Sequence, residues 1–216
     1  MKRAVLFDFD GTLADTAPDL AAAVNRMRTE RHLEALPLAT LRPHASSGAR
    51  GLLRAGFDVY PEHPDYEPMR LTFLDYYTQA LWVQSQLFAD VPELLEELDA
   101  RNIVWGIVTN KATRFAQPIA TQLGFDTRSA CLVCGDTTAH AKPHPAPLLH
   151  AAELLRVAPE HCLYVGDDLR DIQAAQAAGM ISVAVEYGYS GTDHGGPHAW
   201  NADQVIAQPL DLLKLL

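Results

Sequence analysis

Near the N-terminus the chain reads Ala4-Val5-Leu6-Phe7-Asp8-Phe9-Asp10-Gly11-Thr12, a short apolar run that leads into two aspartates. Such a run is typical of a buried strand. Gly11 permits a tight bend directly after it, which can bring Asp8 and Asp10 toward one point. Two carboxylates at the end of a strand can hold Mg²⁺, and one of them can attack phosphorus. Taken alone, the motif is also compatible with an acidic turn after an edge strand.

Further apolar runs follow along the chain, and helical patterns separate them. The strong runs are short, continuous and rich in Val and Ile, as in a parallel sheet that is covered on both faces. The predicted strands are Ala4–Phe7, Ile103–Val108, Cys131–Cys134, Cys162–Val165 and Ile181–Val185, with a weaker one at Gln204–Ala207. The predicted helices of this part are Pro92–Arg101, Thr113–Leu123, Pro147–Val157 and Arg170–Ala178. The alternation predicts an α/β fold with a doubly wound parallel sheet.

The segment 17–87 breaks the alternation, because it contains helical patterns and no convincing strand. Its predicted helices are Asp19–Arg31, Ala49–Gly56 and Pro68–Leu81. The segment directly follows the first strand, so it is expected above the carboxyl edge of the sheet, where open α/β sheets bind ligands. We therefore predict a catalytic core domain of residues 1–16 and 88–216, with residues 17–87 as an inserted α-helical cap domain.

The charge balance limits the class of partner. Among 216 residues, 17 Lys and Arg stand against 27 Asp and Glu, for a formal net charge of −10. Binding to a phosphate backbone needs a basic surface, so no nucleic acid partner is expected. The apolar N-terminal run is shorter than the roughly seven residues of a signal peptide, and no run reaches the roughly 18 of a membrane span. We expect a cytoplasmic protein without a membrane partner, as a monomer or homodimer.

Cysteine and histidine are abundant enough to raise the question of a metal site. Three cysteines, an odd number, agree with a reducing compartment. Cys131 and Cys134 form a C-x-x-C pattern without a second pair, so we interpret it as part of a short buried strand. Neither histidine group has zinc-ligand spacing, and neither is expected to bind metal. These groups are His140, His144 and His150, and His194 and His198. The glycine-rich stretch Tyr187–Asn201 is predicted to be a polar, mobile loop.

Polar residues also follow the second and third predicted strands. Thr109 and Asn110 come directly after the second, where a hydroxyl and backbone amides at a helix start can hold phosphate oxygens. Either residue could instead simply cap the following helix. Lys142 follows the third strand and can neutralise a phosphate and an attacking carboxylate, although an isolated lysine is most often a solvated surface charge.

Three acids follow the fourth predicted strand, at Asp167, Asp168 and Asp171. Like-charge repulsion makes such a group unfavourable unless a cation offsets it. The alternative is an acidic first turn of a helix, which explains Asp168 or Asp171 but accounts less naturally for all three. Because the carboxyl ends of parallel strands meet at one edge, we expect acids, a hydroxyl and a lysine to converge there.

Four motifs together carry a resemblance to a known family. They are D-F-D-G-T at Asp8–Thr12, V-T-N-K at Val108–Lys111, K-P at Lys142–Pro143 and V-G-D-D-L-R-D at Val165–Asp171. In order and spacing the chain resembles the haloacid dehalogenase superfamily. It is most similar to the superfamily's phosphatases with a helical cap after the first strand, the phosphoglycolate phosphatase-like branch.

The resemblance implies a role for each motif residue. Asp8 would be the nucleophile and Asp10 the general acid/base, while Thr109 and Asn110 would hold the phosphoryl group and Lys142 would balance charge. Mg²⁺ would be bound by Asp8, Asp167 and the backbone carbonyl of Asp10. Asp171 would support the site, and Asp168 would point to solvent.

A narrower similarity is to the N-acetylmuramic acid 6-phosphate phosphatases of peptidoglycan recycling. It runs through Leu87–Leu95, Trp105–Lys111, Arg114–Ala116, Gly166–Ile172 and Tyr187–Tyr189. In these subfamilies Ser46–Arg50 is where a loop that reads the substrate is expected, with Ser47, Gly48 and Arg50 as candidates. The implied function is a Mg²⁺-dependent phosphomonoesterase that forms an aspartyl-phosphate.

The implied substrate is a small phosphate monoester, N-acetylmuramic acid 6-phosphate, with phosphoglycolate as the alternative. Two further readings are a sugar-phosphate mutase of the same fold and a non-catalytic module that binds a phosphorylated ligand. A dehalogenase is disfavoured, because Asp10 supplies a proton-transfer group that dehalogenases lack.

Overall fold

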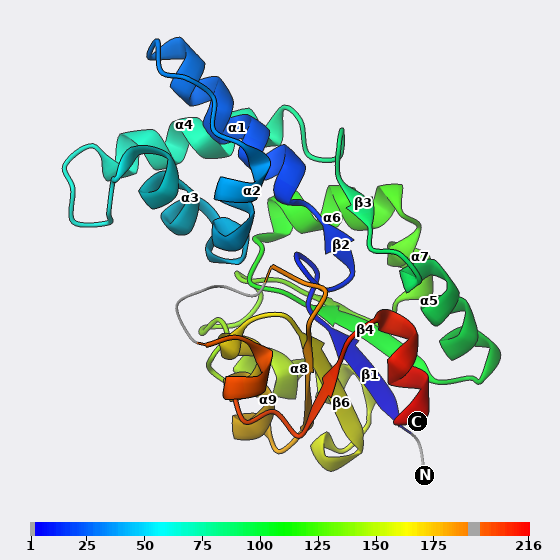
Figure 1. Cartoon of the computed structure of the whole chain (residues 1–216). Helices are drawn as coiled ribbons and strands as arrows, with labels where there is room; N and C mark the ends of the chain where they lie inside the picture. Colours follow the sequence, from blue (N-terminus) through cyan, green and yellow to red (C-terminus); the bar gives the residue numbers. More distant parts are fainter. Residues whose placement is uncertain (1–2, 190–194) are drawn as a thin grey trace.

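A computed structural model of the chain describes residues 3–189 and 195–216, and a parallel sheet lies at its centre (Figure 1). The six strands have the order β5-β4-β1-β6-β7-β8. They are β1 (Ala4–Phe7), β4 (Val104–Val108), β5 (Leu132–Val133), β6 (Cys162–Gly166), β7 (Ile181–Val185) and β8 (Gln204–Ile206). All neighbouring pairs are parallel. The first strand lies inside the sheet and later strands add on both sides, which confirms the doubly wound fold.

Strand β1 shows why the sheet must be covered on both faces. All four of its side chains are buried, and they alternate between two hydrophobic clusters. Val5 and Phe7 belong to the cluster that includes residues of α5 (Val91–Ala100) and α6 (Thr113–Gln122). Ala4 and Leu6 belong to the cluster built with α8 (Ala146–Leu155) and α9 (Leu169–Ala178). A strand between two helical layers needs apolar residues at every position, which is the run observed in the sequence.

The predicted core elements are confirmed with small shifts of their ends. The strand expected at Cys131–Cys134 is reduced to Leu132–Val133, and both of these cysteines are buried free thiols, as interpreted. Short helical turns that carry no clear periodicity were not predicted. They are α7 (Phe125–Arg128), η2 (Pro159–His161), η4 (Pro197–Ala199) and η5 (Pro209–Lys214). Among the described residues, no helix has the length and apolar character needed to cross a bilayer.

A group of helices lies over the carboxyl ends of the strands, at the top of Figure 1. These are α1 (Ala17–Glu30), α2 (Leu38–Leu41), η1 (Arg42–Ser47), α3 (Gly48–Phe57) and α4 (Tyr66–Thr78). They share a hydrophobic cluster of their own, which includes Val24, Leu52 and Phe73 and takes in Phe115 and Tyr189 from outside the segment. The inserted segment is thus helical, and its treatment as a separate cap domain stays a prediction.

Two short strands join this helical segment to the sheet. Strand β2 (Ala14–Asp15) leads into α1, and β3 (Gln86–Leu87) leads back out of α4. They pair antiparallel, Ala14 with Leu87 and Asp15 with Gln86, so the two connections run side by side. The sequence did not predict this pair, because two residues are too short to show a period of alternation.

The stretch 187–201 is more ordered at its start than the predicted mobile loop. Tyr189 is only 4% exposed, and its hydroxyl accepts hydrogen bonds from the backbone N–H groups of Thr16 and Ala17. The distances are 2.6 and 2.9 Å. The predicted loop is therefore wrong for Tyr189, because an aromatic ring packed under the entry to α1 fixes the backbone. The part of the loop at 190–194, including His194, lies outside the described residues.

Candidate active site

The acidic turn after β1 lies against the end of β6. The N–H of Asp8 continues the ladder by donating to the carbonyl of Val165 at 2.9 Å. Gly11 follows with a φ of +89°, a region that favours glycine. A side chain at Gly11 would place its Cβ 2.2 Å from Oδ2 of Asp167. Glycine is therefore required twice, by the backbone conformation and by the carboxylate packed beneath the turn.

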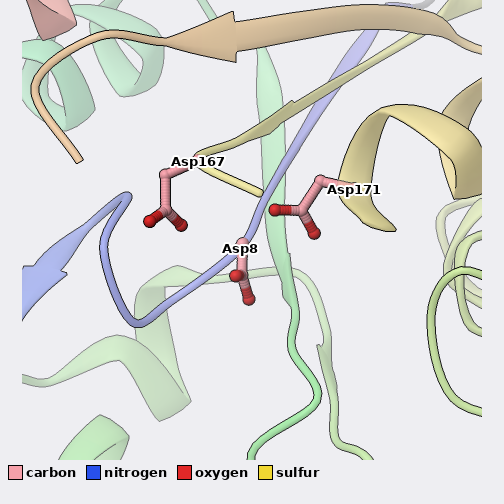
Figure 2. Close-up of side chains that lie close together, drawn as sticks. All are labelled: Asp8, Asp167 and Asp171. Atoms are coloured by element: carbon pink, nitrogen blue, oxygen red, sulfur yellow. The ribbon is translucent and has the colours of Figure 1, made fainter. Parts of the chain in front are cut away.

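Three carboxylates meet at this point (Figure 2). Asp8 comes from the end of β1, Asp167 from the end of β6 and Asp171 from the first turn of α9. One oxygen of each lies within 4.8 Å of the others. Burial, together with the charges of Asp8 and Asp171, raises the pKa of Asp167 well above its usual range. Burial likewise raises the pKa of Asp171 to about 7, while the nearby Lys142 works against this rise.

The cluster fits a hard divalent cation. Carboxylate oxygens are the preferred protein ligands of Mg²⁺, and a cation would offset the repulsion among the three acids. Oδ1 of Asp8 is also buried without a hydrogen bond among the described residues. Asp8 and Asp167 of the predicted metal site lie in this cluster, together with Asp171, which was predicted to support the site. The side chain of Asp10 lies outside the cluster. A contribution from the backbone carbonyl of Asp10 stays a prediction.

Lys142 is the buried counter-charge of the cluster. Its ammonium lies 2.9 Å from Oδ1 of Asp8, an ion pair without hydrogen-bond geometry, and 2.8 Å from Oδ1 of Asp171. It also donates to the hydroxyl of Tyr164 at 2.7 Å and to the carbonyl of Val108 at 3.1 Å. Burial lowers the pKa of Lys142, but Asp171 and Asp8 together raise it by a larger amount. The net pKa therefore lies above its ordinary value.

Asn110 positions Lys142 through its side chain. Its Nδ2 donates to the carbonyl of Lys142, and its Oδ1 accepts from the N–H of Lys142, both at 2.9 Å. The hydroxyl of Thr109 accepts from the N–H of Lys111 at 3.2 Å. The side-chain amide of Asn110 thus contacts the backbone of Lys142 through its oxygen and through one of its two N–H donors. That Thr109 and Asn110 hold a phosphoryl group stays a prediction.

Asp10 faces a lysine that sequence reasoning left without a role. Nζ of Lys111 lies 2.9 and 3.2 Å from the two oxygens of Asp10 and also donates to the hydroxyl of Tyr77 at 2.8 Å. The hydroxyl of Thr16 donates to Oδ1 of Asp10 at 2.5 Å. Burial lowers the pKa of Lys111, but Asp10 and Tyr77 together raise it by more, so the net pKa lies above its ordinary value and the ammonium stays charged. The only sequence signal for Lys111 was its place directly after Thr109 and Asn110.

One further acid and one further cation at this edge connect the inserted helical segment to the sheet. Asp168 was expected to face solvent, but it caps α9 and forms an ion pair with Arg170 at 2.8 Å. Arg170 in turn donates to the carbonyl of Ser46 at 2.8 Å. The hydroxyl of Ser46 donates to Oδ2 of Asp167 at 3.1 Å. The expectation that Asp168 faces solvent is therefore wrong. The start of α9 brings Asp168 together with Arg170, two positions further along the chain.

A cavity of about 340 Å³ opens above these groups, between the sheet edge and the cap helices. Its polar floor includes Asp8, Asp10, Thr109, Asn110, Lys142 and Asp171. Its cap side includes Ser46, Ser47, Gly48, Arg70, Phe73 and Tyr77, and α6 adds Arg114 and Phe115.

The lining only partly matches the predicted substrate-reading loop. Ser47 and Gly48 line the cavity as expected. Arg50 is exposed and is not among the lining residues, so the geometry does not support it as the cap cation. The helix that starts at Gly48 turns position 50 outward. Arg70 and Arg114 line the cavity instead. Arg70 belongs to no predicted motif, and Arg114 belongs to the stretch Arg114–Ala116 of the narrower similarity, which gave it no role.

The chain is similar to known proteins over nearly its whole length. Residues 2–179 match the family model of the haloacid dehalogenase-like hydrolases. An N-acetylmuramic acid 6-phosphate phosphatase of Pseudomonas putida is 45% identical over 99% of this chain and 96% of its own length. A phosphoglycolate phosphatase of Xanthomonas campestris is 49% identical over 97% of this chain and 94% of its own.

A solved structure supports the fold over the same length. It comes from Haemophilus somnus and is described as a predicted phosphoglycolate phosphatase. It superimposes with a TM-score of 0.86 at 29% identity and covers 99% of this chain and 97% of its own. The resemblance inferred from the four motifs is therefore confirmed.

Proposed function

Because the chain belongs to the haloacid dehalogenase-like hydrolases and is a phosphoric monoester hydrolase, we propose that it works through an aspartyl-phosphate on Asp8. We propose Mg²⁺ as its cofactor. The observation that carries both is the meeting of Asp8, Asp167 and Asp171 with a buried ammonium at and directly below the floor of one cavity. A module that only binds a phosphorylated ligand would need neither a nucleophile, such as Asp8, nor a proton-transfer group, such as Asp10.

The residues of the floor divide the work. Asp8 attacks the phosphorus in line, so that an oxygen–phosphorus bond forms as the ester bond to the leaving alcohol breaks. Asp10 gives the departing oxygen its proton and later removes one from the water that hydrolyses the aspartyl-phosphate. Mg²⁺, when bound by Asp8, Asp167 and Asp171, supplies positive charge that offsets repulsion between the carboxylates and the phosphate. Phosphoryl transfer depends chiefly on such positioning and charge stabilisation.

The cations around the floor keep these two aspartates in different environments. Lys142 lies against Asp8, and Asn110 fixes the lysine through two hydrogen bonds. Asp10 is instead held by Lys111 and Thr16, which both bond to its carboxylate. The attacking group and the proton-transfer group are therefore held by separate partners, so each can act without displacing the other.

As substrate we propose N-acetylmuramic acid 6-phosphate. The cavity of about 340 Å³ falls within the range of roughly 300–1,000 Å³ that is usual for small-molecule sites and leaves room for a sugar ring. Ser46 and Ser47 offer hydroxyls, and Phe73, Tyr77 and Phe115 offer ring faces. The Pseudomonas relative favours this substrate by its name.

Phosphoglycolate is the second candidate. The Xanthomonas relative, of similar identity, carries that activity in its name. Phosphoglycolate is much smaller than the sugar ester, so a preference for it would require the cap to close further over the floor. Specificity is the ratio of the two kcat/KM values, which must be measured on one preparation.

One experiment tests the chemistry and the substrate together. Purified protein is given an aryl phosphate, 2-phosphoglycolate or N-acetylmuramic acid 6-phosphate, with Mg²⁺ or with excess chelator, and released phosphate is measured. We expect Mg²⁺-dependent release, fastest from the sugar ester. When turnover is stopped by denaturation and the protein is then reduced with borohydride, the aspartyl-phosphate on Asp8 should be converted to homoserine. Mass spectrometry detects this change. Full activity in chelator, or an isomerised product without free phosphate, would contradict the proposal.

A further inference from the structure

The cations that line the cavity are not equally paired. Four of them have carboxylate partners. These pairs are Arg70–Glu67 at 2.7 Å, Lys111–Asp10 at 2.9 Å, Lys142–Asp171 at 2.8 Å and Arg170–Asp168 at 2.8 Å. Arg114 has no carboxylate within ion-pair distance in the part of the chain that the structure describes. It is the one lining cation in that part without an ion pair. Hydrogen bonds from Thr113 chiefly lower the pKa of the Asp136 carboxyl, and the charge of Arg114 is only a minor cause of that shift.

Arg114 is nevertheless held in place. It is the second residue of α6, and its guanidinium carbon lies 4.5 Å from the centre of the Phe115 ring. Stacking of this kind restrains the planar group and leaves its N–H edges free. The nearby carboxylate of Asp136 is engaged by the N–H and the hydroxyl of Thr113, at 2.9 and 2.5 Å. Asp136, which contacts the start of α6, is therefore hydrogen-bonded to Thr113 and forms no ion pair with Arg114.

A continuous wall joins Arg114 to the catalytic floor. Lys111, which contacts Asp10, donates to the hydroxyl of Tyr77 at 2.8 Å. The Tyr77 ring lies 5.4 Å from the ring of Phe115, on which Arg114 stacks. A leaving group whose phosphate sits at Asp8 and whose body lies along these rings would therefore extend toward the free guanidinium.

We propose that Arg114 is the specificity-determining residue of the site and binds a carboxylate on the leaving group. The inference rests on the proposed phosphatase function and names its substrate class, phosphate monoesters that carry a carboxylate. Guanidinium and carboxylate match as a bidentate pair of opposite unit charge. A second phosphate would bring close to two charges to one unpaired cation.

The test compares esters that differ in the carboxylate. N-acetylmuramic acid 6-phosphate is paired with N-acetylglucosamine 6-phosphate, and 2-phosphoglycolate is paired with 2-hydroxyethyl phosphate. For each pair, kcat/KM of the ester with the carboxylate (the acid) is divided by kcat/KM of the ester without it (called neutral here, since only its phosphate is charged). This ratio is measured in wild type and in Arg114→Gln. We expect this ratio to fall tenfold or more in Arg114→Gln and to recover in part in Arg114→Lys.

Arg54→Gln is the matched control. Arg54 is also an exposed arginine over an aromatic ring, 5.4 Å from the centre of Tyr60, but it does not line the cavity. Its substitution should leave the ratio unchanged. An equal loss on acid and neutral esters in Arg114→Gln, or no loss on either, would overturn the role of Arg114.

A binding arm separates this inference from the proposed function. Calorimetry on Asp8→Asn protein, with and without Arg114→Gln, measures the affinity for the same two pairs without turnover. The second substitution should weaken binding of the acids at least tenfold more than binding of the neutral esters. If wild type turns over no ester, the proposed function is wrong, and this arm still decides for or against Arg114. Equal weakening of both ligand types would reject the inference.

Discussion

The floor of the cavity and its cap side differ in how their charges are balanced. On the floor, Lys142 and Lys111 are buried, and each touches a carboxylate that the chemistry needs. On the opposite side the cations are partly or fully exposed, and one, Arg114, forms no ion pair among the described residues. Buried charges must be paired to be tolerated, so the floor is almost fully determined by its own contacts. The exposed side can vary without unfolding the protein, which suits it to selecting the leaving group.

The largest effect should come from the nucleophile. Asp8→Asn removes the attacking charge while it keeps the shape, so phosphate release should fall by about a thousandfold or more. The substitution also removes one charge from a crowded acidic cluster, so the melting temperature without metal should not fall. Phosphate release and thermal unfolding on the same preparation check both. Turnover near wild type would contradict the assignment.

Removing the counter-charge should break the floor itself. Lys142→Met leaves Asp171 and Asp8 buried without their cation, and breaking such a pair typically destabilises by about 3–5 kcal/mol. Urea unfolding measures this change.

Lys214→Met is the control for that loss. Lys214 pairs with Asp211 but is 76% exposed, so its removal should not change the unfolding midpoint. Similar shifts in the two variants would show that the floor does not depend on its buried pair.

The free energy of unfolding should change less when the contact of Tyr189 with the entry to α1 is removed. Tyr189→Phe removes the hydroxyl that accepts from the N–H groups of Thr16 and Ala17. Leaving buried donors unsatisfied costs about 1–3 kcal/mol, measurable by urea unfolding. Tyr187→Phe is the matched control, because no hydrogen bond of its hydroxyl occurs among the described residues. An equal loss in both variants would mean that ring packing alone, and not the hydroxyl, secures this connection.

The acidic cluster should make stability depend on pH when metal is absent. The folded-state pKa values of Asp167 and Asp171 are raised, so between the unfolded value of about 4 and about 7 the folded protein holds more protons than the unfolded chain. Its free energy of unfolding therefore falls as pH rises through this window. Thermal melts from pH 5 to 8 in chelator should show this decline, and Mg²⁺ should stabilise most at the upper end. A stability that rises with pH in chelator would refute the burial of repelling acids.

The smallest effect should be that of Arg50→Gln. The side chain is exposed and does not line the cavity, so kcat/KM for N-acetylmuramic acid 6-phosphate should change by about twofold or less. Steady-state kinetics beside Arg114→Gln measure the contrast. A larger loss at Arg50 than at Arg114 would reverse the comparison and place specificity in the Ser46–Arg50 loop.

The order of strands and the floor residues could be predicted because they depend on local signals. A buried strand such as Ala4–Phe7 must be apolar at every position, and parallel strands bring their carboxyl ends to one edge. Asp8, Thr109, Lys142 and Asp167 each follow such a run, so their convergence follows from topology. Asp171 belongs to the same logic, one helical turn further along.

Other residues of the site could not be predicted, because their roles depend on contacts between distant segments. Nothing local distinguishes Arg70 from other surface arginines, and the similarity that includes Arg114–Ala116 gave Arg114 no role. Tyr77 meets Lys111 only when α4 folds back over the sheet. The exposed face of Arg50 depends on where α3 begins, a boundary that no periodic pattern sets to within one residue.

The sequence by itself determined the doubly wound sheet, the helical insertion and the set of acids, hydroxyl and lysine at the carboxyl edge. Each of these rests on the period of a strand or helix and on the residue that ends it. Only the tertiary structure decided that the side chain of Asp10 pairs with Lys111, that Asn110 holds Lys142 through two hydrogen bonds, and that Arg114 forms no ion pair among the described residues. The reason is physical. Whether a charged side chain finds an ion-pair partner depends on its neighbours in three dimensions, and a linear pattern does not contain these neighbours.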